Sequence, residues 1–168
     1  MDLLILNRFL YRGGRPRWLA RVMNRGWAAI HSLGILPDYM VTLQVIGRRT
    51  GKKISFPVAL ARVDGREYLV SMLGAKSTWV ANVQAAGGHA VIIHRGEENV
   101  LLTEVPVEER PRILKEYLRI APAARPHMHV KWNGPLEDFE TVAGQFPVFR
   151  VLRMNDANFT RQEGMGDD

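Results

Sequence analysis

The chain has 168 residues, no cysteine and a formal net charge of +6; hydrophobic residues make up 46% and charged residues 24%. This size and composition fit one globular domain with a hydrophobic core and exclude a disordered chain. The absence of cysteine excludes disulfides, thiolate chemistry and cysteine-based metal sites, and it suits a reducing cytoplasm. The positive charge favours anionic partners: phosphorylated cofactors, nucleic acid or anionic lipid headgroups.

The first predicted element is a helix over residues 16–34, which begins at Pro16 and ends near Gly34. Its apolar residues fall on one side, and arginines recur every fourth position on the other. The pattern fits a helix that packs on a core, or one that lies on an anionic membrane. We therefore treat residues 1–38 as an amphipathic segment, with peripheral contact at the inner membrane face as the second interpretation for a cytoplasmic protein.

From Tyr39 the hydrophobic period changes to two, which is typical of half-buried strands. Pro57 predicts an edge or bulged position, because proline cannot donate to a strand ladder. Asp64-Gly65 predicts a hairpin turn. The predicted strands cover residues 40–46, 54–63, 66–73, 89–96, 99–105 and 147–154.

Two short helices are predicted among these strands. One lies within residues 74–88, with Ser77 as its N-cap and glycines at its end. The other covers residues 107–118, with acidic residues and Pro111 in its opening turn. This order predicts an α+β, mainly β fold: a closed or partly closed barrel over residues 39–154 with helices outside it. Residues 155–168 are predicted to form a flexible tail.

Positive charge is concentrated in the turn between the first two strands, "IGRRTGKK" from Ile46 to Lys53. Such a turn leaves backbone N–H groups unpaired, Thr50 adds a hydroxyl donor, and Gly51 lets the chain bend close to a ligand. Arginine can bind phosphate or carboxylate oxygens in a bidentate manner, and lysine acts as a point charge. By spacing alone, the turn fits an anion site and a solvated basic turn equally well.

Three stretches together carry a family resemblance: "GRRTGKKISFPV", "LVSMLGAKSTWVANVQAAGGHAVIIHRG" and "EVPVEERPRIL". Over about Val41 to Val107 the chain resembles the deazaflavin-dependent nitroreductase family, which are split β-barrels similar to FMN-binding pyridoxine-phosphate oxidases. The resemblance implies an oxidoreductase that uses coenzyme F420, an 8-hydroxy-5-deazaflavin. It also implies hydride transfer to a hydrophobic small-molecule acceptor: a quinone, an enone or a nitro compound.

The resemblance also implies site residues. The basic turn would bind the coenzyme's phosphate and oligoglutamate tail through Arg48, Arg49, Thr50, Gly51, Lys52 and Lys53. Ile54 stands where the family commonly has another arginine. The ring would contact Pro57, Val58, Met72, Leu73, Gly74, Ala75 and Trp79, and Asn82 would only cap or brace its own helix.

No catalytic dyad or triad is evident, and the catalytic residue stays unknown. Hydride transfer needs an oriented, dry pocket rather than an acid or base on the protein. His127, His129 and Trp132 are candidates for the substrate side, in place of tyrosines that relatives use there; a surface loop is the alternative for the histidines. Tyr117 is interpreted as a packing residue. No metal site is predicted, because His127 and His129 have no third ligand nearby in sequence.

Three other functions fit less well. An FMN-dependent reductase would need to neutralise only one phosphate, for which four cations are excessive. A carrier could bind cofactor or lipid in the same barrel without catalysis. Nucleic-acid binding is not expected, because the strands do not interleave exposed aromatic and basic residues. The protein is predicted to be a monomer or a weak dimer.

Overall fold

The computed structural model describes residues 37–154. The predicted helix over residues 16–34 and the predicted tail over residues 155–168 lie outside this range, so the corresponding domain boundaries stay predictions. No helix within residues 37–154 combines the length and the apolar character needed to cross a membrane.

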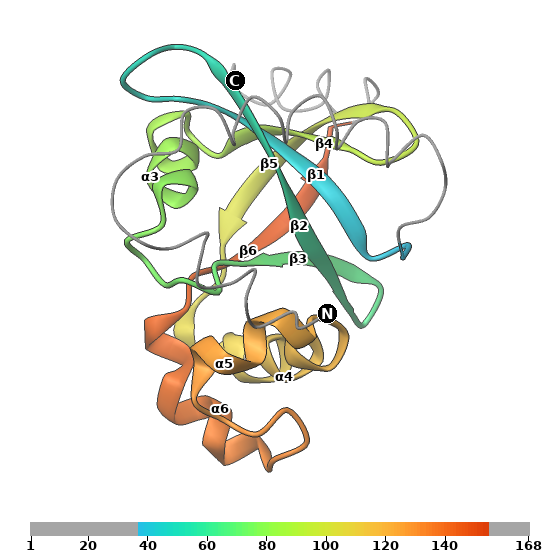
Figure 1. Ribbon diagram of the computed structural model, residues 1–168, viewed down its shortest axis with the longest axis vertical. Helices are drawn as coiled ribbons and strands as arrows, with labels where there is room; N and C mark the ends of the chain where they lie inside the picture. The colour runs from blue at the N-terminus through green and yellow to red at the C-terminus, as the bar shows by residue number, and fades with distance from the viewer. Residues whose placement is uncertain (1–36, 155–168) are drawn as a thin grey trace, which may run out of the picture. The chain divides into compact units, whose positions relative to one another are not determined.

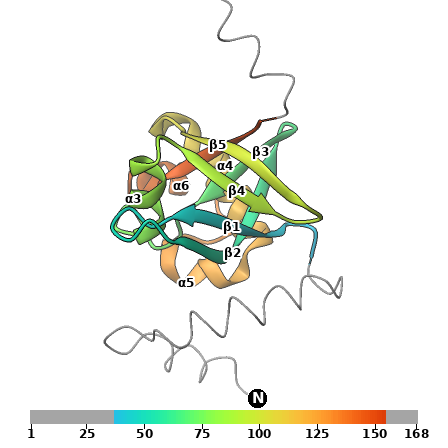
Figure 2. The same cartoon turned by 90° about the horizontal axis from the view of Figure 1, so that it is seen from above.

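Antiparallel strands close into a barrel in the order β1-β2-β3-β6-β5-β4, which confirms the predicted fold class (Figure 1, Figure 2). Three neighbouring pairs along the chain, β1–β2, β2–β3 and β4–β5, form hairpins, β1 also pairs with β4, and β6, the last strand, fits between β3 and β5. The strands are β1 (Met40–Ile46), β2 (Lys53–Val63), β3 (Arg66–Val70), β4 (His89–Ile93), β5 (Glu97–Glu104) and β6 (Val148–Arg153).

The strand pattern and the turns explain this barrel locally. Val41, Leu43 and Val45 alternate with more exposed residues and are buried in the barrel interior, as a period of two requires. Asp64 and Gly65 both have positive φ, 50° and 74°, as a two-residue type I′ hairpin demands. β3 ends at Val70 rather than at the predicted Leu73, because the Ser71 hydroxyl donates to the Gly74 carbonyl at 2.7 Å and turns the chain.

One stretch of β2 has a strand on one side only. All of β1 pairs with Lys53–Ala59, whereas β3 pairs only with Leu60–Val63. Among the described residues, no strand covers the other edge of residues 53–59. Pro57 lies within this free edge, opposite Thr42, so the predicted edge position is confirmed. The barrel is therefore split beside the first half of β2.

Helices pack at two places around the barrel (Figure 1). α3 (Thr78–Ala85) lies against β1, and α4 (Arg110–Ile120) packs on β2 and on α6 (Leu136–Val142), with α5 (Arg125–Met128) between them in the chain. Short 3-10 turns flank these helices at Val107–Glu109, Pro122–Ala124 and Ala143–Gln145. α6 was not predicted from the sequence, although Pro135 and the acidic pair Glu137 and Asp138 mark its start.

The buried residues form two clusters. One fills the barrel around Leu43, Leu69 and Phe149, and the other joins α4 and α6 to the outside of β2 and β3 around Leu114 and Phe139. A buried arginine, Arg110, fixes the start of α4: its guanidinium donates to the carbonyls of Val105, Ala143 and Phe146 and pairs with Glu104 at 3.0 Å. These contacts of Arg110 hold the start of α4 in place beside the barrel.

Candidate functional site

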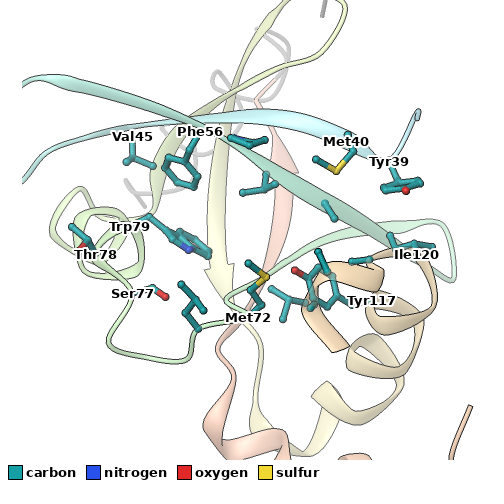
Figure 3. Close-up of a pocket in the computed structure, with 18 of the residues that line it drawn as sticks. Tyr39, Met40, Val45, Phe56, Met72, Ser77, Thr78, Trp79, Tyr117 and Ile120 are labelled. Atoms are coloured by element: carbon teal, nitrogen blue, oxygen red, sulfur yellow. The ribbon is translucent and has the colours of Figure 1, made fainter. Parts of the chain in front are cut away.

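A pocket of about 600 Å³ lies along the free edge of β2 (Figure 3). β1 and β2 form one wall of the pocket. The connection from β3 to α3 and the end of α4 line the rest of it. At one end of this wall Val45 is paired with Ile54, and at the other Met40 is paired with Ala59. The ladder between these pairs spans about 16 Å at 3.3 Å per residue. The pocket is thus an elongated apolar groove that a closed sheet would not have.

The connection from β3 to α3 is held in place by its own hydrogen bonds. The buried Ser71 hydroxyl contacts both the Gly74 carbonyl at 2.7 Å and the Ser77 hydroxyl at 2.8 Å. Gly74 has φ +80°, and a Cβ there would lie 3.2 Å from the Gln145 carbonyl, so this position requires glycine. Ser77 is the N-cap residue, as predicted, but no side-chain capping bond forms because its hydroxyl is engaged with Ser71.

Trp79 forms the side of the pocket that faces the barrel. Its ring centroid lies 6.3 Å from that of Phe56 and 5.4 Å from that of Phe149, both tilted. Such tilted aromatic pairs fix ring orientation and contribute about 0.5–1.5 kcal/mol each. Figure 3 shows Trp79 directed into the pocket from α3. The indole is therefore a rigid wall against which a planar molecule could lie.

The basic turn is attached to α3 through a single buried side chain. Oδ1 of Asn82 accepts hydrogen bonds from the backbone N of Arg48 at 3.2 Å and from its guanidinium at 3.0 Å. Asn82 is 2% exposed and also lines the pocket. It therefore does not cap its own helix, as the sequence analysis supposed, but holds the turn at the Val45–Ile54 end of the groove. Only the tertiary structure could bring together residues so distant in sequence.

The remaining cations of the turn are free to bind an anion. Gly51 has φ +64° and donates to the Gly47 carbonyl at 2.8 Å, which closes the turn. Within residues 37–154, the side chains of Arg49, Lys52 and Lys53 are exposed and make no ion pair with a carboxylate. Of the predicted tail-binding residues, these three present uncompensated charge and Arg48 is partly committed to Asn82. The predicted tail site stays a prediction.

The predicted ring-contact residues fall into two groups. Pro57, Val58, Met72, Leu73 and Trp79 all line the pocket. Gly74 and Ala75 do not contribute to its lining; they shape the turn behind Leu73. Segments from β2 and from the β3–α3 connection thus line one pocket, and their contact with the coenzyme ring stays a prediction.

The end of the pocket beyond Met72 is lined by residues that the sequence analysis did not assign. Tyr117, on α4, is 4% exposed. Burial raises the pKa of its hydroxyl to about 12, so the side chain is protonated and neutral at neutral pH. The same end is also lined by Tyr39, Met40, Ala59, Ile120 and residues 121–124. Tyr117 was interpreted as a packing residue because it lies in the apolar stripe of its helix, and only the position of α4 shows that this stripe borders a pocket.

The three candidates for the substrate side lie elsewhere. His127, His129 and Trp132 do not line this pocket. Trp132 is 42% exposed, and the Arg125 guanidinium lies 4.8 Å from its ring centroid; it borders a separate, open basin beside the outer face of α4. His129 is the residue that ends α5, with φ 51°. Within residues 37–154, no three potential metal-binding side chains of the His, Cys, Asp and Glu types lie together.

Sequence comparison adds a decisive observation to this geometry. The sequence profile described as F420H(2)-dependent quinone reductase matches residues 19–131. The chain belongs to the F420H(2)-dependent quinone reductase family. As a member of this family it is an oxidoreductase that uses coenzyme F420, which confirms the predicted enzyme class and cofactor. A search of curated protein sequences finds no match.

Three solved structures illustrate what this F420H(2)-dependent quinone reductase family member is similar to. A protein of unknown function from Agrobacterium tumefaciens shares 9% identity at a TM-score of 0.49, covering 70% of this chain and 49% of its own; the chain thus spans about half of its length. An F420-H2 dependent reductase shares 22% sequence identity at a TM-score of 0.44. The match covers 70% of this chain and 97% of that protein. A conserved hypothetical protein from Mycobacterium tuberculosis shares 15% sequence identity at a TM-score of 0.48. The match covers 76% of this chain and 80% of that protein.

Proposed function

We propose that the groove beside the free edge of β2 binds coenzyme F420, with its ring against Trp79 and its tail at the basic turn. One observation carries this proposal: Asn82 lines an apolar pocket and at the same time holds the basic turn. A ligand that fits both features must join an apolar planar part to an anionic part. The ring would lie against Trp79, Pro57, Val58 and Met72, and the phosphate and glutamates would be bound by Arg49, Lys52 and Lys53.

The residues of the groove then orient reactants and exclude water. When bound, the reduced coenzyme supplies a hydride. Trp79, held by Phe56 and Phe149, fixes the plane of the ring, and the apolar lining keeps water away from the reacting atoms. Holding two reactants in a dry, oriented pocket removes much of the entropic barrier to their reaction. No ionised acid or base lines the pocket within the described residues.

We further propose a quinone as the acceptor, with enones and nitro compounds as weaker candidates. The end of the pocket at Met40, Ala59 and Ile120 is apolar, as a flat hydrophobic acceptor requires. The description of the family, F420H(2)-dependent quinone reductase, names a quinone as the acceptor. This supports the order of preference.

A binding titration tests the coenzyme assignment. The full-length chain should quench the fluorescence of coenzyme F420 on mixing and bind FMN and NADPH far more weakly, because only F420 carries both a phosphate and several carboxylates. With the reduced coenzyme, menadione should then restore the absorbance of the oxidised form. Tighter binding of FMN would contradict the proposal. Coenzyme binding without turnover of menadione, an enone or a nitro compound would indicate a carrier instead.

Peripheral membrane contact through residues 1–38 is a separate proposal, supported only by the basic amphipathic pattern of that segment. Deleting residues 1–12 should reduce co-sedimentation with vesicles that contain anionic lipid, while coenzyme binding persists. Equal sedimentation of both forms would contradict it. The state of a monomer or a weak dimer and the lack of nucleic-acid binding also stay predictions.

A further inference from the structure

The hydroxyl of Tyr117 belongs to a well-buried side chain and borders the pocket. The side chain is 4% exposed, and within residues 37–154 it makes no hydrogen bond. The hydroxyl oxygen is not among the fully buried side-chain atoms that lack a partner in this part of the chain, so it is open to the space of the pocket that Tyr117 lines. Figure 3 shows its oxygen directed towards the interior of the pocket, on the side of Met72. A ligand in the pocket can therefore accept a hydrogen bond from this hydroxyl.

Tyr117 lies at one edge of the region assigned to the coenzyme ring, and Met72 borders both. Tyr117 packs in one cluster with Ala59, Met40 and Met72. Trp79, Phe56 and Val58 pack against the other cluster, inside the barrel. Tyr117 thus borders the Met40–Ala59 end of the groove, whereas the basic turn borders the Val45–Ile54 end.

Other polar side chains of the pocket do not compete for this role. Oδ1 of Asn82 accepts from Arg48, and the Ser77 hydroxyl is bonded to that of Ser71. Thr78 is exposed, and these three lining residues all belong to α3 or to its N-cap. Tyr39 precedes β1 at the rim and is half-buried. The enclosed apolar end therefore contains one well-buried donor, Tyr117, among the residues that the structure describes.

We propose that the Tyr117 hydroxyl donates a hydrogen bond to a carbonyl oxygen of the acceptor and stabilises the negative charge that develops there. This inference rests on the proposed function. In the reaction the acceptor gains two electrons and one hydrogen as a hydride, the reduced deazaflavin is oxidised by the same two electrons, and the product oxyanion takes a proton from water. Tyr117 keeps its own proton throughout, so it discriminates acceptors that carry a suitably placed oxygen from those that do not.

The expected loss of rate without the Tyr117 hydroxyl follows from the environment of that hydroxyl. A donor fixed towards an oxyanion in a water-poor site contributes about 100-fold to 1,000-fold in kcat. Tyr117→Phe removes only the hydroxyl and keeps the ring that packs in the core. We therefore expect kcat with menadione to fall on the order of 100-fold, while the affinity for coenzyme F420 stays unchanged. Reduction of phenazine methosulfate, an acceptor without oxygen, should be unaffected.

Tyr68→Phe is the matched control. Tyr68 is also a buried tyrosine, on β3, but does not line this pocket. It should behave like the unsubstituted chain with both acceptors. An equal loss with menadione and phenazine methosulfate, unchanged rates with both, or a loss of coenzyme affinity in Tyr117→Phe would overturn the inference.

A second measurement does not depend on turnover. In a complex with oxidised coenzyme, the infrared carbonyl stretch of bound menadione should lie at lower frequency in the unsubstituted chain and in Tyr68→Phe than in Tyr117→Phe. An identical stretch in all three would overturn the inference even if rates differed. Failure of the proposed function would look different: the unsubstituted chain itself would not bind the coenzyme.

Discussion

Replacing Arg49, Lys52 and Lys53 with alanine should weaken binding of coenzyme F420 by about a hundredfold and leave the melting temperature nearly unchanged. These side chains are exposed and make no ion pair with carboxylates in residues 37–154, so the fold does not depend on them. A charge-assisted contact at an exposed site contributes about 1 kcal/mol, and three such contacts give roughly a hundredfold in affinity. Fluorescence titration and thermal melting measure the two effects.

The ligand can be varied to show that the tail is what these cations bind. The deazaflavin riboside, which lacks the phosphate and the glutamates, should bind the triple variant and the unsubstituted chain equally. Arg66, Arg95 and Lys131 are exposed and lie outside the pocket lining, so their triple alanine variant removes the same charge as a control. If the control weakened coenzyme binding equally, the general field of the protein would be responsible and the assignment of the turn would be wrong.

Asn82 makes Arg48 a different case from its neighbours. Arg48→Ala removes a hydrogen bond to a buried amide oxygen as well as a charge. We therefore leave Arg48 out of the triple variant, since its loss would change both the position of the turn and its charge.

Trp79→Ala should have the second large effect, on both the fold and the ring site. The indole is half-buried and packs between Phe56 and Phe149. Truncation of a packed tryptophan to alanine costs about 3 kcal/mol of unfolding free energy. Because it also removes the wall of the proposed ring site, affinity should fall for the full coenzyme and for the riboside alike. Denaturant unfolding and fluorescence titration measure these changes.

Trp79→Phe separates packing from recognition. A phenyl ring keeps part of the contact with Phe149, so most of the stability should return, with an intermediate affinity for the riboside. If Trp79→Ala bound the riboside as tightly as the unsubstituted chain does, the ring would lie elsewhere in the groove. The two sets of variants thus probe opposite ends of one ligand, and their effects on the riboside should differ.

Sequence motifs were enough to predict the cofactor class of this F420H(2)-dependent quinone reductase family member. They predicted the arrangement of the site only in part. The basic turn, Pro57 on a free edge and Trp79 at the start of a helix are all local patterns, and each lies where it was predicted. The assignment of His127, His129 and Trp132 to the substrate side has no support in the geometry, because none of the three lines the pocket. Tyr117, dismissed as packing, borders it instead.

The sequence by itself determined the elements whose cause is local. The period of two in residues 40–46 and 54–63, the Asp64-Gly65 turn and the glycine in the basic turn follow from backbone geometry and side-chain alternation. Tertiary structure alone decided which edge of β2 is left unpaired, that Asn82 holds Arg48, and that the inner stripe of α4 opens on a cavity at Tyr117. These features depend on contacts between residues distant along the chain, and an apolar stripe has the same pattern whether it faces a filled core or an empty groove.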